Sequence, residues 1–371
     1  MTDRDEFRER LRDRLAGALL GTAVGDALGL PGEGLSRRRF ARWHPGPLRH
    51  RFLFGRGMVS DDTEHAFMLA QSFLDAPDDP DLFGRRFASR LKRWFLALPA
   101  GVGLGTARAC LKMLVGFPPA KSGVRSAGNG PAMRSALLGV LLAENVSAEP
   151  DRLRRWVSAA TTLTHTDPRA LTAALAVADM ARLGAATPFG ADPPAASALA
   201  ERLASLAAED AEWRRCVDRM DTAWTNGHEV AAFAEAMGQG QGISGYAYAT
   251  VPAAIYAWRR HWGDFAATVE SVIRCGGDTD TTGAVAGALA GANGGATAIP
   301  TAWLDGMRDW PVGVPLLRDA AERLSTWKLT GQSPGPAPYA GFGVLPRNVF
   351  FLLIVLAHGF RRLGPPYGGG T

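Results

Sequence analysis

The fold of this chain is decided by residues 7–29, FRERLRDRLAGALLGTAVGDALG, whose side chains become steadily smaller toward the end. Glycine recurs there at every fourth position, which places the glycines near one face of a predicted helix. Residues 282–292, TGAVAGALAGA, repeat this spacing. The glycines of the two stretches are Gly17, Gly21, Gly25 and Gly29, then Gly283, Gly287 and Gly291. Because each interior glycine costs about 1 kcal/mol of helix propensity relative to alanine, the stripes indicate helices whose backbones lie very close to a neighbour.

The rest of the chain also predicts a mainly α-helical protein. Strand signals are sparse, and segments rich in alanine and leucine with helical spacing dominate. Such segments include residues 64–75, 195–220 and 250–260. Of the 371 residues, 47 % are hydrophobic, which is ample for one large core. A stretch rich in proline and glycine begins at residue 331, so we expect a main domain at residues 1–330 and a linker with a C-terminal helix at residues 331–371.

Composition argues against several classes of protein. The formal net charge is +5, and lysine and arginine are scattered rather than gathered into a stripe with aromatics, so we expect no stable nucleic-acid partner. The cysteines Cys110, Cys216 and Cys275 are too few and too far apart for a disulfide framework or a zinc knuckle. The chain opens with a charged segment that lacks an apolar signal region. We therefore expect a cytoplasmic protein.

Residues 349–360, VFFLLIVLAHGF, form a strongly apolar stretch near the end of the chain. This stretch is shorter than the ~20 residues that span a bilayer. We expect a helix whose Phe, Leu, Ile and Val side chains pack on the core, and no membrane contact. An interfacial anchor and an oligomer contact remain the alternatives.

Two acidic clusters carry the chemistry of the chain. The first is Ser60-Asp61-Asp62-Thr63, and the second is residues 276–282, GGDTDTT. Together they offer four carboxylates and several hydroxyls, and such oxygen ligands suit Mg²⁺ or Mn²⁺ rather than zinc or copper. Brought together in space, the clusters predict a two-metal centre. The alternative is that each cluster caps a helix, with its remaining acids complementing the helix dipole.

The second cluster needs an irregular backbone to act as one site. Asp278 and Asp280 are two residues apart, about 200° around a regular helix, which would point them away from each other. The Gly276-Gly277 pair permits a turn on which both carboxylates converge. Asp280 or Thr281 is then expected to cap a helix that begins at Thr282.

Six short motifs follow one another in the order typical of the ADP-ribosylglycohydrolase family, which the sequence resembles up to about residue 330. They are Gly25-Asp26-Ala27-Leu28-Gly29 with Glu33, Ser60-Asp61-Asp62-Thr63, Gly128-Asn129-Gly130 with Ala132-Met133-Arg134, Thr164-His165, residues 248–256 (YATVPAAIY), and residues 276–282. One such motif would be weak evidence, whereas six in order are specific. Two features depart from the family pattern: Ser135 and the residues after it replace a frequent proline, and residues 36–51 (SRRRFARWHPGPLRHR) are unusually rich in arginine. Both are expected to border the cleft.

The resemblance implies a compact, orthogonal, all-α fold with a dinuclear metal cleft that holds two Mg²⁺ or Mn²⁺ ions. The metal ligands that it implies are Ser60, Asp61, Asp62, Asp278, Asp280 and Thr281, with Asp280 as the bridge. It places Glu33 beside the metals, which makes Glu33 the first candidate for general acid/base and Asp62 the second. The elements that it implies around ADP-ribose are Gly128, Asn129, Gly130 and His165.

The expected activity is therefore hydrolysis by a metal-dependent enzyme. Such an enzyme would cleave the glycosidic or ester bond to the distal ribose of ADP-ribose, on a modified protein or a small molecule. The ions would hold the ribose hydroxyls while the anomeric carbon passes through an oxocarbenium-like state. Two alternatives remain open: a non-catalytic ADP-ribose-binding or structural protein on the same fold, and a two-metal phosphohydrolase.

Other residues near the motifs have a structural and a functional interpretation. We expect Cys275 to be a small buried hydrophobe rather than a nucleophile. We expect His65 to face solvent or to lie behind the metals, and Asp26 to be a buried hydrogen-bonding strut rather than a ligand. Residues 101–106, GVGLGT, can cradle a phosphate at a helix start, but no strand precedes them, which argues against a dinucleotide-binding loop. Tyr248 and its neighbouring tyrosines either belong to the core or stack on adenine.

Overall fold

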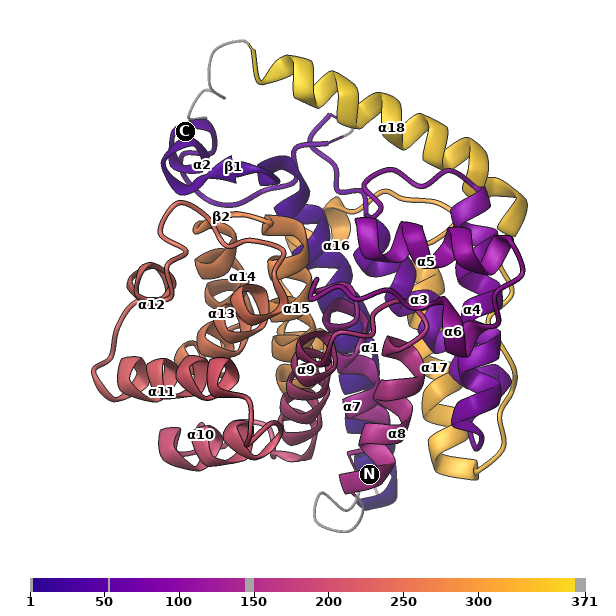
Figure 1. Ribbon diagram of the computed structural model, residues 1–371, viewed down its shortest axis with the longest axis horizontal. Helices are drawn as coiled ribbons and strands as arrows, with labels where there is room; N and C mark the ends of the chain where they lie inside the picture. Colours follow the sequence, from indigo (N-terminus) through magenta and orange to yellow (C-terminus); the bar gives the residue numbers. More distant parts are fainter. Residues whose placement is uncertain (1–2, 53, 144–149, 364–371) are drawn as a thin grey trace.

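A computed structural model describes residues 3–52, 54–143 and 150–363. Within these residues the chain forms eighteen α-helices, four 3₁₀ helices and one two-stranded ribbon, β1–β2, as Figure 1 shows. The prediction of an all-α fold is confirmed.

The helices and strands in chain order are α1 (Asp3–Gly29), η1 (Leu30–Gly32), β1 (Leu35–Ser36), α2 (Arg37–Trp43), α3 (Asp61–Asp75), α4 (Pro80–Leu96), α5 (Leu104–Leu114), α6 (Pro119–Ser122), η2 (Ala132–Arg134), α7 (Ala136–Leu141), α8 (Pro150–Thr161), α9 (Pro168–Ala186), α10 (Ala196–Ser205), α11 (Ala211–Thr225), α12 (Val230–Ala236), α13 (Ala247–Arg260), α14 (Phe265–Ile273), β2 (Gly276–Gly277), α15 (Thr279–Gly294), η3 (Ala296–Ala298), α16 (Thr301–Gly306), α17 (Val314–Thr330), η4 (Gly341–Gly343) and α18 (Val344–Arg361).

The two glycine stripes face each other across α1 and α15, which lie side by side in the middle of the molecule (Figure 1). A Cβ atom added at Gly21 would lie 2.1 Å from the carbonyl oxygen of Gly287, and one added at Gly287 would lie 2.2 Å from that of Gly21. The same mutual contact recurs in the pairs Gly17–Gly291 and Gly25–Gly283. The backbones therefore touch directly, as the stripes predict, and any larger side chain would force the helices apart.

The remaining helices pack around this central pair. Helices α3, α7 and α17 pack on α1, and helices α9, α13 and α14 pack on α15. At one end of the pair, the hydroxyl of Thr279 donates a hydrogen bond of 2.7 Å to the carbonyl oxygen of Gly29. The end of α1 and the start of α15 are thereby fixed against each other, although they are far apart in the sequence.

One predicted helix is wrong in its extent. The segment 195–220 is divided into α10 and α11, because the Asp210 side chain accepts hydrogen bonds from the backbone N–H groups of Glu212 and Trp213 and starts a new helix there. Helix α13 begins at Ala247, a few residues before the predicted start.

The end of the chain is fastened to the core mainly by polar groups. The Gln71 side chain bonds both the N–H and the C=O of Ala337, which pins the proline-rich stretch. Helix α18 then runs along the outside of the molecule for 18 residues, longer than the predicted 349–360 (Figure 1). Its buried side chains are Arg347, Asn348, Phe351 and His358. The expectation that its Phe, Leu, Ile and Val side chains are buried is therefore wrong for most of them.

By length and composition alone, two helical segments in the described part of the chain could cross a membrane. The most apolar 18-residue stretch of the first, Glu6–Gly32, is completely buried and belongs to the central core helix α1. In the most apolar 18-residue stretch of the second, Gly341–Arg361, only 28% of the residues are buried.

We expect Gly21→Ala to destabilise the protein, because its methyl group would overlap the Gly287 backbone. Overpacking of this kind costs about 1–3 kcal/mol, and the midpoint of urea unfolding measures it. The matched control is Gly359→Ala in α18, where an added Cβ meets no atom within 4 Å. There the gain in helix propensity should raise stability. A Gly21→Ala variant as stable as the natural protein would contradict the direct contact between backbones.

Candidate active site

A short ribbon places Glu33 next to the second acidic cluster. Strand β1 pairs antiparallel with β2, with Leu35 opposite Gly277, and Gly34 N–H donates to Gly277 O at 2.8 Å. Gly277 has φ 87°, and a Cβ atom there would lie 2.1 Å from the oxygen of Ile243. Only glycine satisfies both constraints. The ribbon therefore requires the Gly-Gly pair that precedes the acids.

The start of α15 brings Asp278 and Asp280 together, as predicted, but by a different route. The helix begins at Thr279, so the prediction that Asp280 or Thr281 caps a helix starting at Thr282 is wrong. Asp278 occupies the capping position without using its side chain as a cap. Its Oδ2 instead accepts a hydrogen bond of 2.7 Å from Asn129 Nδ2, and its carboxyl is near enough to Asp280 to contribute to raising the pKa of Asp280.

The first cluster meets the second through Asp62. Ser60 caps α3, and its hydroxyl lies 3.1 Å from Asp62 Oδ2. The Thr281 hydroxyl donates to the same oxygen at 3.3 Å. Two segments more than two hundred residues apart thus share one carboxylate.

Asp26 supports the first cluster from behind. Its Oδ2 accepts hydrogen bonds from Ser60 N–H at 2.8 Å, from the Thr63 hydroxyl at 2.5 Å and from Thr63 N–H at 3.3 Å. Burial raises its pKa to about 6, against the opposing effect of these hydrogen bonds. Asp26 is the buried strut that its place in a glycine-striped helix predicts.

The acids of the site repel one another. Burial, and then neighbouring negative charge, raises the pKa of Asp61, Asp62 and Asp280 well above the usual range. Glu33 lies at the exposed rim, yet desolvation of its carboxyl and the charge of Asp278 also raise its pKa. A cluster of this kind is costly unless a cation or protons compensate it.

The donor set fits a hard divalent cation. Asp62 Oδ1 and Asp280 Oδ1 are buried and have no hydrogen-bond partner within the described residues, and oxygen atoms dominate the surroundings. Across the described ranges, no group of three or more His, Cys, Asp and Glu side chains is already arranged around a metal position.

His165 faces a set of glycine-rich loops. Arg134 donates to the Thr164 hydroxyl at 2.7 Å, and that hydroxyl donates to Thr161 O at 3.3 Å and lies 2.9 Å from His165 Nδ1. Burial, followed by the charge of Arg134, lowers the pKa of His165 to about 3, so the imidazole is neutral. Cβ atoms added at the nearby glycines would lie within 3.4 Å of the ring; these glycines are Gly105, Gly128 and Gly130. His165 is thus a neutral imidazole beside the Gly-Asn-Gly loop.

Several neighbouring residues are structural. His65 is fully buried, edge-on to Trp94 and 3.1 Å from Arg134 Nη1, so the option that it faces solvent is wrong. Burial raises the pKa of Cys275 to about 11, which agrees with an inert hydrophobe rather than a nucleophile. Tyr248 is buried in the core.

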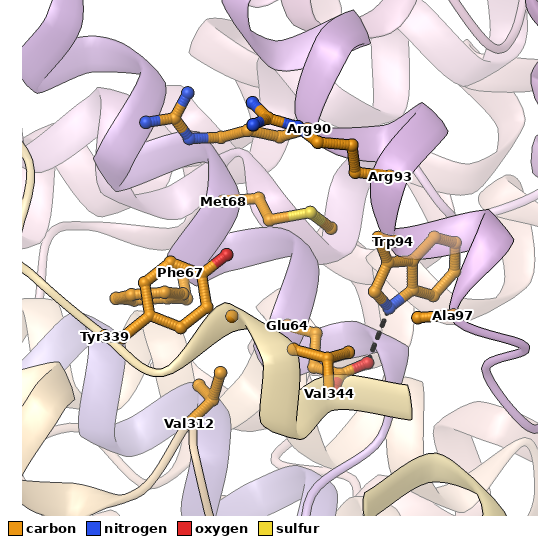
Figure 2. Close-up of a pocket in the computed structure, with 11 residues that line it drawn as sticks. Glu64, Phe67, Met68, Arg90, Arg93, Trp94, Ala97, Val312, Tyr339 and Val344 are labelled. Carbon is orange, nitrogen blue, oxygen red and sulfur yellow. Dashed lines mark hydrogen bonds between the residues drawn. The ribbon is translucent and has the colours of Figure 1, made fainter. Parts of the chain in front are cut away.

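Glu64 follows the first cluster but is engaged elsewhere. Its Oε2 accepts a hydrogen bond of 2.6 Å from the Trp94 indole N–H, as Figure 2 shows, and its Oε1 lies 3.6 Å from Arg347 Nη1. These groups border a cavity of about 340 Å³ between α3, α4 and residues 339–344, with Phe67 and Tyr339 on one wall (Figure 2). Glu64 is therefore a structural acid rather than part of the ligand set.

The C-terminal helix contacts the segment that carries Glu33, which the sequence did not reveal. His358 Nε2 lies 3.1 Å from Pro31 O, and Arg362 donates to Pro31 O at 2.7 Å and to Glu33 O at 3.0 Å. More than three hundred residues separate these partners, and no pattern in either segment signals the contact.

Comparisons with known proteins identify the family of the chain. The family model of ADP-ribosylglycohydrolase matches residues 8–334. A solved structure described as an ADP-ribosylglycohydrolase-related protein complex is 31% identical, covers 88% of this chain and 99% of its own, and superposes with a TM-score of 0.62. A search of curated proteins finds no match. The resemblance of the six motifs is therefore confirmed, and the chain belongs to the ADP-ribosylglycohydrolase family.

Proposed function

We propose that this member of a family of hydrolases of ADP-ribose compounds cleaves the bond between the distal ribose of ADP-ribose and an attached group. The attached group belongs to a modified protein or a small molecule. The observation that carries the proposal is the meeting of Glu33, the α3 acids and the α15 acids at one place, with Asn129 bonded to Asp278.

The acidic cluster is proposed to hold two Mg²⁺ or Mn²⁺ ions. The residues that would hold them are Ser60, Asp61, Asp62, Asp278, Asp280 and Thr281. When bound, the ions supply positive charge that compensates the acids and orients the ribose hydroxyls. The unpartnered oxygens of Asp62 and Asp280 support this assignment.

The reaction requires a proton acceptor and a positioned substrate. Water bonds to the anomeric carbon as the bond to the attached group breaks, and the ribose passes through an oxocarbenium-like state. Glu33, at the rim of the cluster, takes a proton from that water and returns it to the leaving group, with Asp62 as the second candidate for this role. The Gly128-Asn129-Gly130 loop and the neutral imidazole of His165 hold the rest of ADP-ribose.

Metal binding should reverse the sign of one mutational effect. Asp280→Asn removes a buried like charge, so the metal-free variant should melt at a higher temperature than the natural protein. With Mg²⁺ or Mn²⁺ bound, the natural protein should melt at the higher temperature. Calorimetry should show that Asp280→Asn lowers the affinity for the metal at least about 10-fold. Exposed Asp218→Asn is the matched control and should change neither quantity. Two-site binding that Asp280→Asn leaves intact would exclude Asp280 as the bridge.

Glu33→Gln should bind ADP-ribose normally but turn over ~10²-fold or more slowly, the usual scale for a general acid/base. Release of ADP-ribose from ADP-ribosylated arginine, serine, nucleic-acid base and acetyl ester, followed by mass spectrometry, measures the rate and the substrate class. Cys275→Ser should remain active. If Glu33→Gln stays within a few-fold of the natural protein, the role passes to Asp62.

The products also separate the alternative functions. Free ADP-ribose supports the proposed hydrolase. AMP would indicate a two-metal phosphohydrolase. Tight ADP-ribose binding without any product would indicate a binding protein on the same fold.

A further inference from the structure

Helix α18 has the opposite polarity from a helix that covers a soluble protein. An ordinary surface helix turns its apolar side chains inward and its polar side chains to solvent. Between residues 344 and 360, the polar side chains are Arg347, Asn348 and His358, and all three are buried. The exposed large side chains of the same stretch are all apolar: Leu345, Val349, Phe350, Leu352, Leu353, Leu356 and Phe360, at 45–72% exposure.

This apolar face is held on the outside of the molecule at both ends. Near its start, Arg347 pairs with Asp309 at 2.5 Å and Asn348 donates to Ala97 O at 2.9 Å. Near its end, His358 and Arg362 bond the carbonyl of Pro31. Helix α18 therefore lies flat along one edge of the protein (Figure 1).

A basic segment lies under and beside this helix. Residues 34–58 contain seven arginines and no Asp or Glu. The segment contacts α18 directly: the Phe52 ring lies 4.9 Å from that of His358, and the Arg361 guanidinium lies 5.8 Å from the centre of the Trp43 ring. Its exposed arginines are Arg38, Arg39, Arg42, Arg49 and Arg56.

We propose that α18 docks the protein flat onto an anionic lipid surface, which replaces the expectation from the sequence of no membrane contact. The apolar face would lie at the boundary between headgroups and acyl chains, and the arginines of residues 34–58 would meet the headgroups. A lipid surface accounts for both features, whereas a second copy of the chain would cover the apolar face and leave the basic segment unexplained.

The same contacts argue against a helix that spans the bilayer. At about 1.5 Å per residue the helix is about 27 Å long, close to the ~30 Å hydrocarbon core. Insertion of α18 across the bilayer would break the hydrogen bonds and the ion pair that Arg347, Asn348 and His358 make with the protein. These side chains would then lie in hydrocarbon, where each unsatisfied polar group costs several kcal/mol.

Vesicle flotation with the full chain tests the proposal. The protein should float with vesicles of phosphatidylcholine mixed with phosphatidylglycerol, more weakly with phosphatidylcholine alone, and less as salt is added. Phe350→Gln/Phe360→Gln should lower binding at least roughly 10-fold, because two exposed aromatic side chains lose their apolar contact. The matched control is Phe7→Gln/Phe189→Gln, two exposed phenylalanines. Phe7 belongs to α1 and Phe189 packs under Arg14 of α1, and the N-terminal end of α1 lies on the opposite side of the molecule from α18 (Figure 1), so this variant should bind normally.

A second pair of variants tests the basic segment. Arg38→Gln/Arg42→Gln should lower binding to the mixed vesicles roughly 10- to 30-fold and reduce the salt dependence. The matched control is Arg214→Gln/Arg215→Gln on the distant helix α11, which should leave vesicle binding and its salt dependence unchanged. Circular dichroism and the thermal midpoint verify that each variant is folded.

Three results would overturn the proposal. The first is no flotation of the natural protein with the mixed vesicles at low salt. The second is a dimer in sedimentation experiments that Phe350→Gln/Phe360→Gln dissolves, without any vesicle binding, because the face would then be a contact between copies. The third is bound protein that resists extraction by alkaline carbonate, which would indicate a spanning helix.

Discussion

The direct contact between the α1 and α15 backbones is the constraint on which the rest of the structure depends. Because glycine faces glycine along both helices, the helices approach without side chains between them. This close approach puts the end of α1 against the start of α15, where Thr279 bonds Gly29. Glu33 follows α1 and Asp278 precedes α15, so the packing of two glycine stripes sets the distance between the candidate acid/base and the candidate metal ligands.

That packing also explains why the acidic cluster is tolerated. A rigid pair of helices keeps like charges close to each other. In a flexible scaffold, the same charges would move apart. Asp26, in the glycine-striped part of α1, fixes the Ser60–Thr63 turn with three hydrogen bonds. The core thus supplies the free energy that keeps Asp62 and Asp280 buried beside each other. A bound cation would recover part of that cost, as in other oxygen-ligand sites.

The sequence predicted the features that local pattern determines. The glycine stripes, the acids and the strut role of Asp26 all follow from residue type and spacing. The start of α15 was missed, because the Asp278 side chain bonds Asn129, which is distant in the sequence, instead of capping the helix. The division of the 195–220 segment was missed although its cause, the cap by Asp210, is local. The burial of His65 and the exposed apolar face of α18 depend on which neighbours the folded chain supplies. The apolar stretch alone gave no indication that its few polar residues would be the ones buried.

Helix α18 links the surface of the molecule to its candidate site. At one end, Arg347 donates to Val59 O, next to Ser60, and holds Asp309, which also accepts from Val59 N–H. At the other end, Arg362 donates to Glu33 O. Both segments that enter the acidic cluster are therefore fastened to a helix that lies beyond the matched family region, residues 8–334. The helix that presents the apolar face is therefore also the element that bonds the segments of Ser60 and Glu33.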